Sequence, residues 1–301
     1  MIYTLTLNPS IDYIMKLDEF IDGATNRSYE DKKYPGGKGI MVSKLLKNLG
    51  EDPINLGFVG GFTGDYIVKS LENLGVKEDF TKIEGQSRIN VKLKYDTETE
   101  INAGGPDIKD DEINEFFKKL QKINDNDTLI ISGSIPKSLS KDFYKRVLDT
   151  KKMEFTVDIA GEELLDYLPY NPLLVKPNID ELEAIFHTKI DDRNILEYAK
   201  KLQTLGAQNV IISLGKDGSI FISDELNLKA YSIEGNLINS VGAGDSMVAG
   251  FIYGIKNGLP KKDAYKLAVA CGTATAFSED IASKEYVYEI LEKVEVKDYG
   301  N

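Results

Sequence analysis

Short apolar runs rich in β-branched residues alternate along this chain with segments whose apolar positions recur every three or four residues. The first pattern is typical of buried strands and the second of helices. Strands are therefore expected at 2–7, 54–59, 128–132, 154–158, 173–176, 210–214 and 219–222. Helices are expected at 39–49, 65–74, 111–123, 138–148, 179–186, 195–205, 245–257 and 261–277. This alternation predicts an α/β fold in which helices cover both faces of a mainly parallel sheet.

One region departs from this alternation. Ile89, Val91 and Leu93 are separated by polar residues, and the same character continues into 99–102. A period of two with one apolar face is typical of a half-buried antiparallel strand rather than of a central parallel one.

The segments 11–17 and 27–34 have a similar character. We interpret about 11–34 and about 86–103 as a small β-sheet set apart from the main core. Such a sheet either covers a site as a lid or pairs with a second copy of itself; an ordinary β-meander is the alternative. Because no Pro/Gly/Ser-rich linker divides the chain, one domain is expected over 1–301.

The composition argues against several classes of partner. The net charge of −12 makes nucleic acid and anionic membranes unsuitable partners, because both require a basic surface. No apolar run approaches the roughly 18 residues of a membrane span, and the N-terminus lacks the pattern of a signal peptide. The single cysteine, Cys271, permits no intramolecular disulfide, so the cytoplasm is the expected location.

Histidine and cysteine are too scarce for several kinds of catalytic site. A Ser-His-Asp or Cys-His site would have to use His187, and a zinc site would lack its usual ligands. Acid–base chemistry is therefore assigned to carboxylates or lysines. A metal, if used, is expected to be a hard ion such as Mg²⁺.

The strongest chemical signal is the loop 240–246, Ser-Val-Gly-Ala-Gly-Asp-Ser, which opens a predicted helix. Its glycines let the backbone approach a ligand closely, and the free N–H groups of the first helical turn suit a phosphate. Asp245 is either a plain N-cap or a base that takes a proton from an attacking hydroxyl. We favour the base, because a carboxylate beside a phosphate site is electrostatically costly without a function. The loop matches neither the Walker A pattern nor Gly-x-Gly-x-x-Gly.

Three other turns have two interpretations each. The glycine loop 35–39 is a second ligand-binding loop that opens a helix or a tight turn before a helix. The segment 176–178 with Glu181 is a site for hydrated magnesium or a capping box. The segment 213–218 is a nucleotide-binding turn or a plain hairpin connection.

Taken in order, these motifs resemble the ribokinase-like family of carbohydrate kinases, in its phosphofructokinase B branch. The resemblance covers essentially the whole chain and rests on 6–12 (TLNPSID), 36–37 (GG), 132–136 (SGSIP), 176–178 (KPN) and 242–245 (GAGD). It implies a three-layer α/β/α sandwich with a β-sheet lid, and often a homodimer formed through the lids. It also implies ATP as the phosphoryl donor and Mg²⁺ as the metal.

The resemblance further implies a role for individual residues. Asp245 is the implied catalytic base, and the backbone amides of Gly242, Ala243 and Gly244 are the implied anion hole. Sugar-phosphate contacts are implied for Asp12, Arg27, Gly36, Gly37, Lys38, Arg88 and Asn90, of which Arg27, Lys38 and Arg88 are the candidates for the phosphate already on the sugar. Nucleotide contacts are implied for Lys176, Asn178, Ser213, Gly215 and Gly218, and Mg²⁺ is expected on Asn178 and Glu181 through water.

One position departs from the family pattern. Met41 stands where the family usually has an asparagine that contacts a sugar hydroxyl. Losing such a hydrogen bond typically costs about 0.5–1.5 kcal/mol. Weaker sugar binding or a changed sugar preference is therefore expected, but not a loss of catalysis.

Within the branch, the segments 88–94 and 99–102 are most similar to members that phosphorylate fructose 1-phosphate. The implied reaction is transfer of the γ-phosphoryl group of ATP to O6 of that sugar, giving fructose 1,6-bisphosphate and ADP. Tagatose 6-phosphate and fructose 6-phosphate are alternative acceptors. A non-catalytic sugar-phosphate sensor with the same fold is a more distant alternative.

Overall fold

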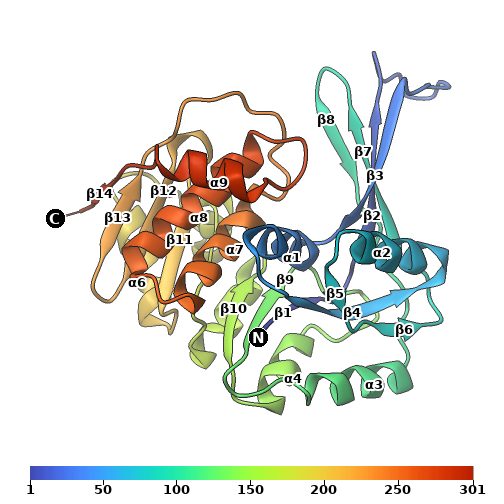
Figure 1. Ribbon diagram of the computed structural model, residues 1–301, viewed down its shortest axis with the longest axis horizontal. Coiled ribbons are helices and arrows are strands. Elements are labelled where there is room, and N and C mark those ends of the chain that lie inside the picture. Colours follow the sequence, from blue (N-terminus) through green and yellow to red (C-terminus); the bar gives the residue numbers. More distant parts are fainter. Residues whose placement is uncertain (301) are drawn as a thin grey trace.

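The computed structural model describes residues 1–300, which form a long central sheet between two layers of helices (Figure 1). The sheet begins with β5 (Lys77–Glu78), β4 (Ile54–Gly60), β1 (Ile2–Thr6), β9 (Thr128–Ser132) and β10 (Glu154–Asp158), all parallel, and β6 (Thr81–Ile83) also pairs with β4. It continues with β11 (Asn209–Ser213), β12 (Ser219–Ser223), β13 (Asn227–Ala230) and β14 (Val296–Asp298), which are antiparallel to one another. The predicted α/β fold is confirmed, with an antiparallel end to the sheet.

The predicted strand 173–176 is wrong as an element. Only Val175 makes bridges, to Val157 on one side and to Val210 on the other, and these bridges join the two halves of the sheet. Pro172 and Pro177 bracket the apolar run, and proline has no N–H to donate to a strand ladder. The apolar run therefore fills a core position without forming a regular strand.

Helices cover both faces because successive strand residues point to opposite sides. On β9, Ile130 belongs to one apolar core, whereas Leu129 and Ile131 belong to the other. The first core is covered by α1 (Lys38–Leu49), α7 (Ala243–Lys256), α8 (Lys261–Ala276) and α9 (Lys284–Leu291). The second is covered by α3 (Asp110–Leu120), α4 (Phe143–Thr150), α5 (Ile179–Phe186) and α6 (Ile195–Thr204). The helix α2 (Gly61–Asn73) packs against β4 and the small sheet, and three short 3₁₀ helices lie at Glu162–Asp166, Leu168–Tyr170 and Gly215–Asp217.

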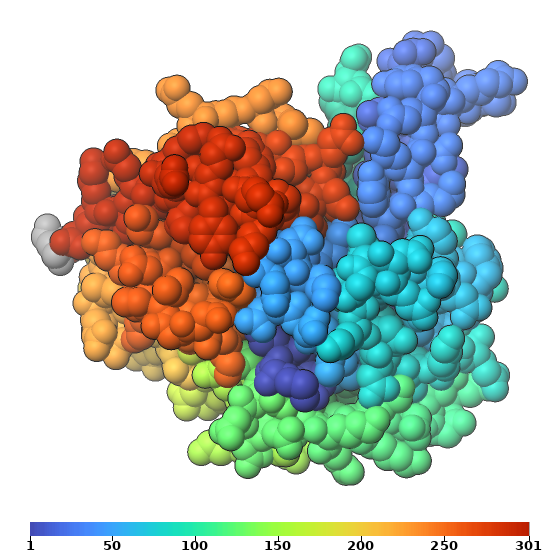
Figure 2. Space-filling model, viewed as in Figure 1, coloured from blue at the N-terminus to red at the C-terminus, as the bar shows by residue number. Residues whose placement is uncertain are grey.

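A second, four-stranded sheet projects from the main body (Figures 1 and 2). Its order is β3 (Glu30–Gly36), β2 (Ser10–Lys16), β7 (Arg88–Lys94) and β8 (Glu98–Ile101). The strand β7 is antiparallel to β8, as its period of two predicts, but it is parallel to β2. In this register Asp12, Asn90 and Lys92 share the face that borders the main body, and Val91 and Ile101 lie on the opposite face.

The parallel strands determine where a site can form. Thr6 ends β1, Ser132 ends β9 and Asp158 ends β10, so these residues meet at one edge of the sheet. Ligands in parallel α/β sheets collect at this edge. Among residues 1–300, no helix is both long enough and apolar enough to cross a membrane.

Candidate active site

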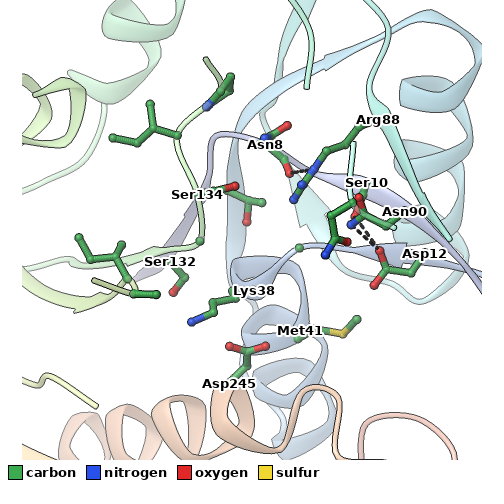
Figure 3. Close-up of a pocket in the computed structure, with 18 of the residues that line it drawn as sticks. Asn8, Ser10, Asp12, Lys38, Met41, Arg88, Asn90, Ser132, Ser134 and Asp245 are labelled. Carbon is green, nitrogen blue, oxygen red and sulfur yellow. Dashed lines mark hydrogen bonds between the residues drawn. The ribbon is translucent and has the colours of Figure 1, made fainter. Parts of the chain in front are cut away.

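A cavity of about 920 Å³ lies between the small sheet and the edge where β1, β9 and β10 end (Figure 3). The residues predicted from the sequence that line it are Asp12, Gly37, Lys38, Arg88, Asn90 and Asp245. Six of the predicted sugar-phosphate and catalytic residues thus come together from separate parts of the chain. Arg27 does not line the cavity, because it lies on the exposed loop between β2 and β3.

The face of the small sheet that borders the main body contains a buried hydrogen-bond network around Asp12. Ser10 Oγ donates to Asp12 Oδ1 at 2.7 Å, and Asn90 Nδ2 lies 3.2 Å from the same oxygen. Gly36 faces this carboxylate so closely that an added Cβ would lie 2.4 Å from Asp12 Oδ1. The close approach requires glycine at position 36, although Gly36 itself is not among the cavity-lining residues. Asp12 is therefore fixed in orientation where it meets the cavity.

Arg88 is held at the same end by backbone carbonyls. Its Nε donates to Asn8 O at 3.0 Å, and its Nη1 donates to Ala103 O at 3.1 Å. Burial lowers the pKa of this guanidinium, and the nearby Asp12 carboxylate opposes that change. A half-buried arginine fixed through two of its nitrogens presents its remaining donors in one direction, which suits an anion.

Sequence reasoning missed Lys92 and Glu100 in the cavity wall. Lys92 Nζ lies 3.1 Å from Glu100 Oε1 and 3.8 Å from Asp12 Oδ2, and its side chain is buried. The signal was present in the alternation of 88–94, which places Lys92 on the same face as Asn90. The alternation shows which side chains share one face of the strand, but it does not show which part of the protein that face contacts.

The start of α7 forms the other end of the cavity. Gly242 has φ 80°, a left-handed conformation that favours glycine, and it caps the helix that begins at Ala243. Asp245 lies in the first helical turn and is buried. Burial, reinforced by the negative charge of Asp158, raises the pKa of Asp245 to about 7. The side chain of Asp245 is not a helix cap here, so the capping interpretation fails.

Asp158 was also missed, although its position at the end of a parallel strand could have identified it. Lys38 Nζ lies 3.3 Å from Asp158 Oδ2, and Lys176 Nζ lies 3.6 Å from Asp158 Oδ1. Burial alone would raise the pKa of Asp158, but the two ammonium groups outweigh it and hold that pKa below its usual range. Lys176 also reaches the start of α7, since an added Cβ on Gly244 would lie 2.9 Å from its Nζ.

The residues predicted to bind the nucleotide and magnesium lie near the start of α5 and the end of β11. Asn178 and Glu181 form a capping box at the start of α5, in which Asn178 Oδ1 accepts from Glu181 N and Glu181 Oε2 accepts from Asn178 N. A backbone bridge places Asn178 beside Ser213. The capping interpretation is thus confirmed, and the second oxygen of Glu181 takes no part in it.

The turn after β11 is built by its two glycines. Gly215 has φ 58° and Gly218 has φ 92°, and an added Cβ on Gly218 would lie 2.1 Å from Ala230 O. The turn therefore needs glycine at Gly218 to connect β11 with β12. A nucleotide contact at these residues stays a prediction.

Several polar atoms around the cavity have unused hydrogen-bonding capacity. Within the described chain, Thr6 Oγ1, Asn8 Oδ1, Asn90 Oδ1 and Ser132 Oγ are buried without a partner. Met41 lines the cavity between the small sheet and Gly242. In residues 1–300 no group of three or more His, Cys, Asp or Glu side chains is arranged to hold a metal ion.

Comparison with known proteins identifies relatives of nearly full length. The model of the pfkB family carbohydrate kinases matches residues 5–284. A 1-phosphofructokinase of Bacillus subtilis is 45% identical over 300 residues, covering 98% of this chain and 99% of that protein. A D-tagatose-1-phosphate kinase of Bacillus licheniformis is 35% identical, covering 98% and 99%. The crystal structure of phosphofructokinase-2 from Escherichia coli in complex with substrates and products is 25% identical, with a TM-score of 0.92 and coverage of 97% and 98%.

Proposed function

This chain belongs to the pfkB family of carbohydrate kinases, and we propose that it transfers the γ-phosphoryl group of ATP to O6 of fructose 1-phosphate. The products are fructose 1,6-bisphosphate and ADP. The 1-phosphofructokinase of Bacillus subtilis, 45% identical over nearly the whole chain, supports this acceptor.

The observation that carries the proposal is the placement of Arg88 and Asp245 at opposite sides of one cavity (Figure 3). A phosphorylated ketohexose has an anion on one terminal carbon and a free hydroxyl at the other end. Arg88 is the cation that recognises the phosphate already on the sugar, and Asp245 is the base beside the attacking hydroxyl. Asp12 and Asn90 lie between Arg88 and Asp245 and are the proposed partners of the sugar hydroxyls.

In the proposed reaction Asp245 accepts the proton of the attacking O6 hydroxyl. A carboxyl with a pKa of about 7 is well matched to this task near neutral pH. The amide groups of Gly242, Ala243 and Gly244 at the start of α7 stabilise the charge on the moving phosphoryl group. Phosphoryl transfer needs alignment and charge neutralisation more than covalent assistance.

Mg²⁺ fits the donors near α5. This ion keeps several waters and uses one or two carboxylates together with substrate phosphates, rather than an all-protein cage. Asn178 and the free oxygen of Glu181 are the proposed contacts, through water. Mg²⁺ supplies charge neutralisation on the ATP phosphates. Lys176, Ser213, Gly215 and Gly218 are the proposed neighbours of the nucleotide.

An ADP-release assay tests the proposal. With Mg·ATP, kcat/KM is compared for fructose 1-phosphate, tagatose 6-phosphate, fructose 6-phosphate and tagatose 1-phosphate. We expect fructose 1-phosphate to be preferred by at least tenfold, which corresponds to about 1.4 kcal/mol of transition-state discrimination. A preference for any other sugar phosphate contradicts the proposed acceptor and leaves the kinase mechanism in place.

The second candidate acceptor is a tagatose phosphate. The specific support is the D-tagatose-1-phosphate kinase of Bacillus licheniformis, which is 35% identical to this chain. Fructose and tagatose differ only in configuration at C4, so the same base and the same arginine serve both. A non-catalytic sensor would show no ADP release that depends on a sugar phosphate.

We further propose that the small sheet acts as a lid and as the contact between two copies. Ile89 and Ile101 on its outer face are 38% and 57% exposed, and Val91 pairs across the strands with Ile101. Exposed apolar side chains on one sheet face support association. Arg27 is on an exposed loop of this sheet, so its predicted substrate contact requires lid movement or a second copy. Sedimentation velocity of Ile101→Lys tests this: a dimeric wild type and a monomeric variant are expected.

A further inference from the structure

Lys38 lies away from the position expected for a ligand of the substrate's own phosphate. Its side chain lies next to Asp245 and extends away from Arg88 (Figure 3). Its Nζ is paired with Asp158 at 3.3 Å, and the same carboxylate holds Lys176 at 3.6 Å. One buried aspartate thus holds two ammonium groups at the start of α7, next to the proposed base.

We propose that Lys38 is a catalytic residue that contacts the phosphoryl group in transfer, and that Asp158 is the positioning residue that holds Lys38 and Lys176 in place for it. This inference rests on the proposed kinase function. It departs from the sequence-based expectation, which assigned Lys38 to the phosphate already on the sugar. Of the three cations predicted for that phosphate (Arg27, Lys38 and Arg88), Arg88 is then the one that lines the cavity and remains assigned to it.

The burial of the cluster supports the assignment. The side chains of Asp158 and Lys176 are 3% and 7% exposed, whereas that of Lys38 is 35% exposed and lines the cavity. Lys38 therefore presents a positively charged side chain to the cavity, whereas Asp158 and Lys176 lie behind it. A positive charge beside the amides at the start of α7 favours an anion at this place.

The proposed role of Lys38 is tested by comparing how a substitution changes kcat with how it changes KM. In Lys38→Met we expect kcat to fall by about 10²–10³-fold, the usual effect of removing one donor to developing charge. The KM for fructose 1-phosphate should change by less than about threefold, because binding of the ground state is not the function removed. A tenfold or larger rise in that KM with kcat retained would overturn the proposal and restore Lys38 to the sugar phosphate.

The matched controls come from the far end of the same helix. Lys47 forms an exposed ion pair with Asp52 at 2.6 Å. Lys47→Met and Asp52→Asn remove the same chemical groups outside the cavity and should leave kcat and KM unchanged. If wild-type enzyme releases no ADP in response to any sugar phosphate, the proposed function fails; if wild type is active and Lys38→Met matches Lys47→Met, only this inference fails.

The pH profile separates positioning from general structural damage. The charged groups around Asp245 are Lys38 from α1, Asp158 from β10, Lys176 before α5 and, farther away, Glu181 acting on Lys38. Lys38→Met removes a positive charge and should move the acidic limb of kcat/KM to higher pH. Asp158→Asn should lower kcat and move that limb to lower pH. Shifts in the same direction would overturn the proposal, and if Asp158→Asn does not fold, Lys38→Met alone decides.

Discussion

Asp245 and Asp158 are buried in the same cluster, yet burial and neighbouring charge raise the pKa of the first and the two lysines lower that of the second. The difference follows from the contacts. Asp158 takes both ammonium groups directly, at 3.3 and 3.6 Å, so it stays ionised and adds negative charge beside Asp245. Two neighbouring carboxylates with separated pKa values support the proposed roles, in which Asp158 is a fixed charge and Asp245 exchanges a proton.

The first prediction concerns pH. Because the base must be unprotonated and its pKa is about 7, kcat/KM should rise about tenfold per pH unit below neutrality and level off above it. The measurement is kcat/KM for fructose 1-phosphate between pH 5 and 9 with saturating Mg·ATP. An acidic limb centred near pH 4 would show that Asp245 has an ordinary pKa in the enzyme that has bound Mg·ATP.

The second prediction concerns Asp245 as the base. Asp245→Asn keeps the side-chain shape but cannot accept the proton, so kcat should fall by about 10²–10⁴-fold. Binding of ATP, measured by calorimetry, should be retained, because the nucleotide contacts are proposed at other residues. Near-normal turnover in this variant would exclude Asp245 as the base.

The third prediction concerns stability. A carboxyl whose folded-state pKa lies above its unfolded value contributes full stability below that unfolded value and loses it as pH rises toward the folded pKa. For Asp245 this window runs from its ordinary range near pH 4 to about 7. Asp245→Asn should therefore have a higher Tm than wild type at pH 8, and the difference should shrink at pH 5. An equal difference at both pH values would contradict the linkage.

The sequence predicted the local elements well because both faces of the sheet are buried. Glu154–Asp158 and Ile179–Phe186 form where the apolar patterns place them. The run 173–176 was wrongly predicted to be a strand because hydrophobic periodicity takes no account of the prolines on either side of it. Asp158 could not be linked to Lys38, 120 positions away, since only the folded chain brings the end of β10 within reach of the Lys38 side chain.

The fourth prediction concerns Arg88. Arg88→Met should raise the KM for fructose 1-phosphate at least tenfold, because a charge-assisted pair to a phosphate is worth about 1.5–3 kcal/mol. It should leave the KM for unphosphorylated fructose unchanged, which is the internal control. Equal losses with both sugars would mean that Arg88 only supports the loop at Asn8 and Ala103.

The last prediction concerns Met41, at the position where the resemblance to the family implies an asparagine. Its side chain lines the cavity and approaches Gly242, with Met41 Cγ 3.8 Å from the position of an added Cβ. Met41→Asn offers a sugar hydroxyl one more hydrogen bond, worth about 0.5–1.5 kcal/mol, so the KM for the preferred sugar phosphate should fall about 2- to 12-fold with kcat little changed. Met41→Leu is the matched control, since it keeps the apolar volume and adds no polar group. A KM that rises in Met41→Asn would show instead that the thioether packs against the substrate and that this chain binds its sugar through an apolar contact at this position.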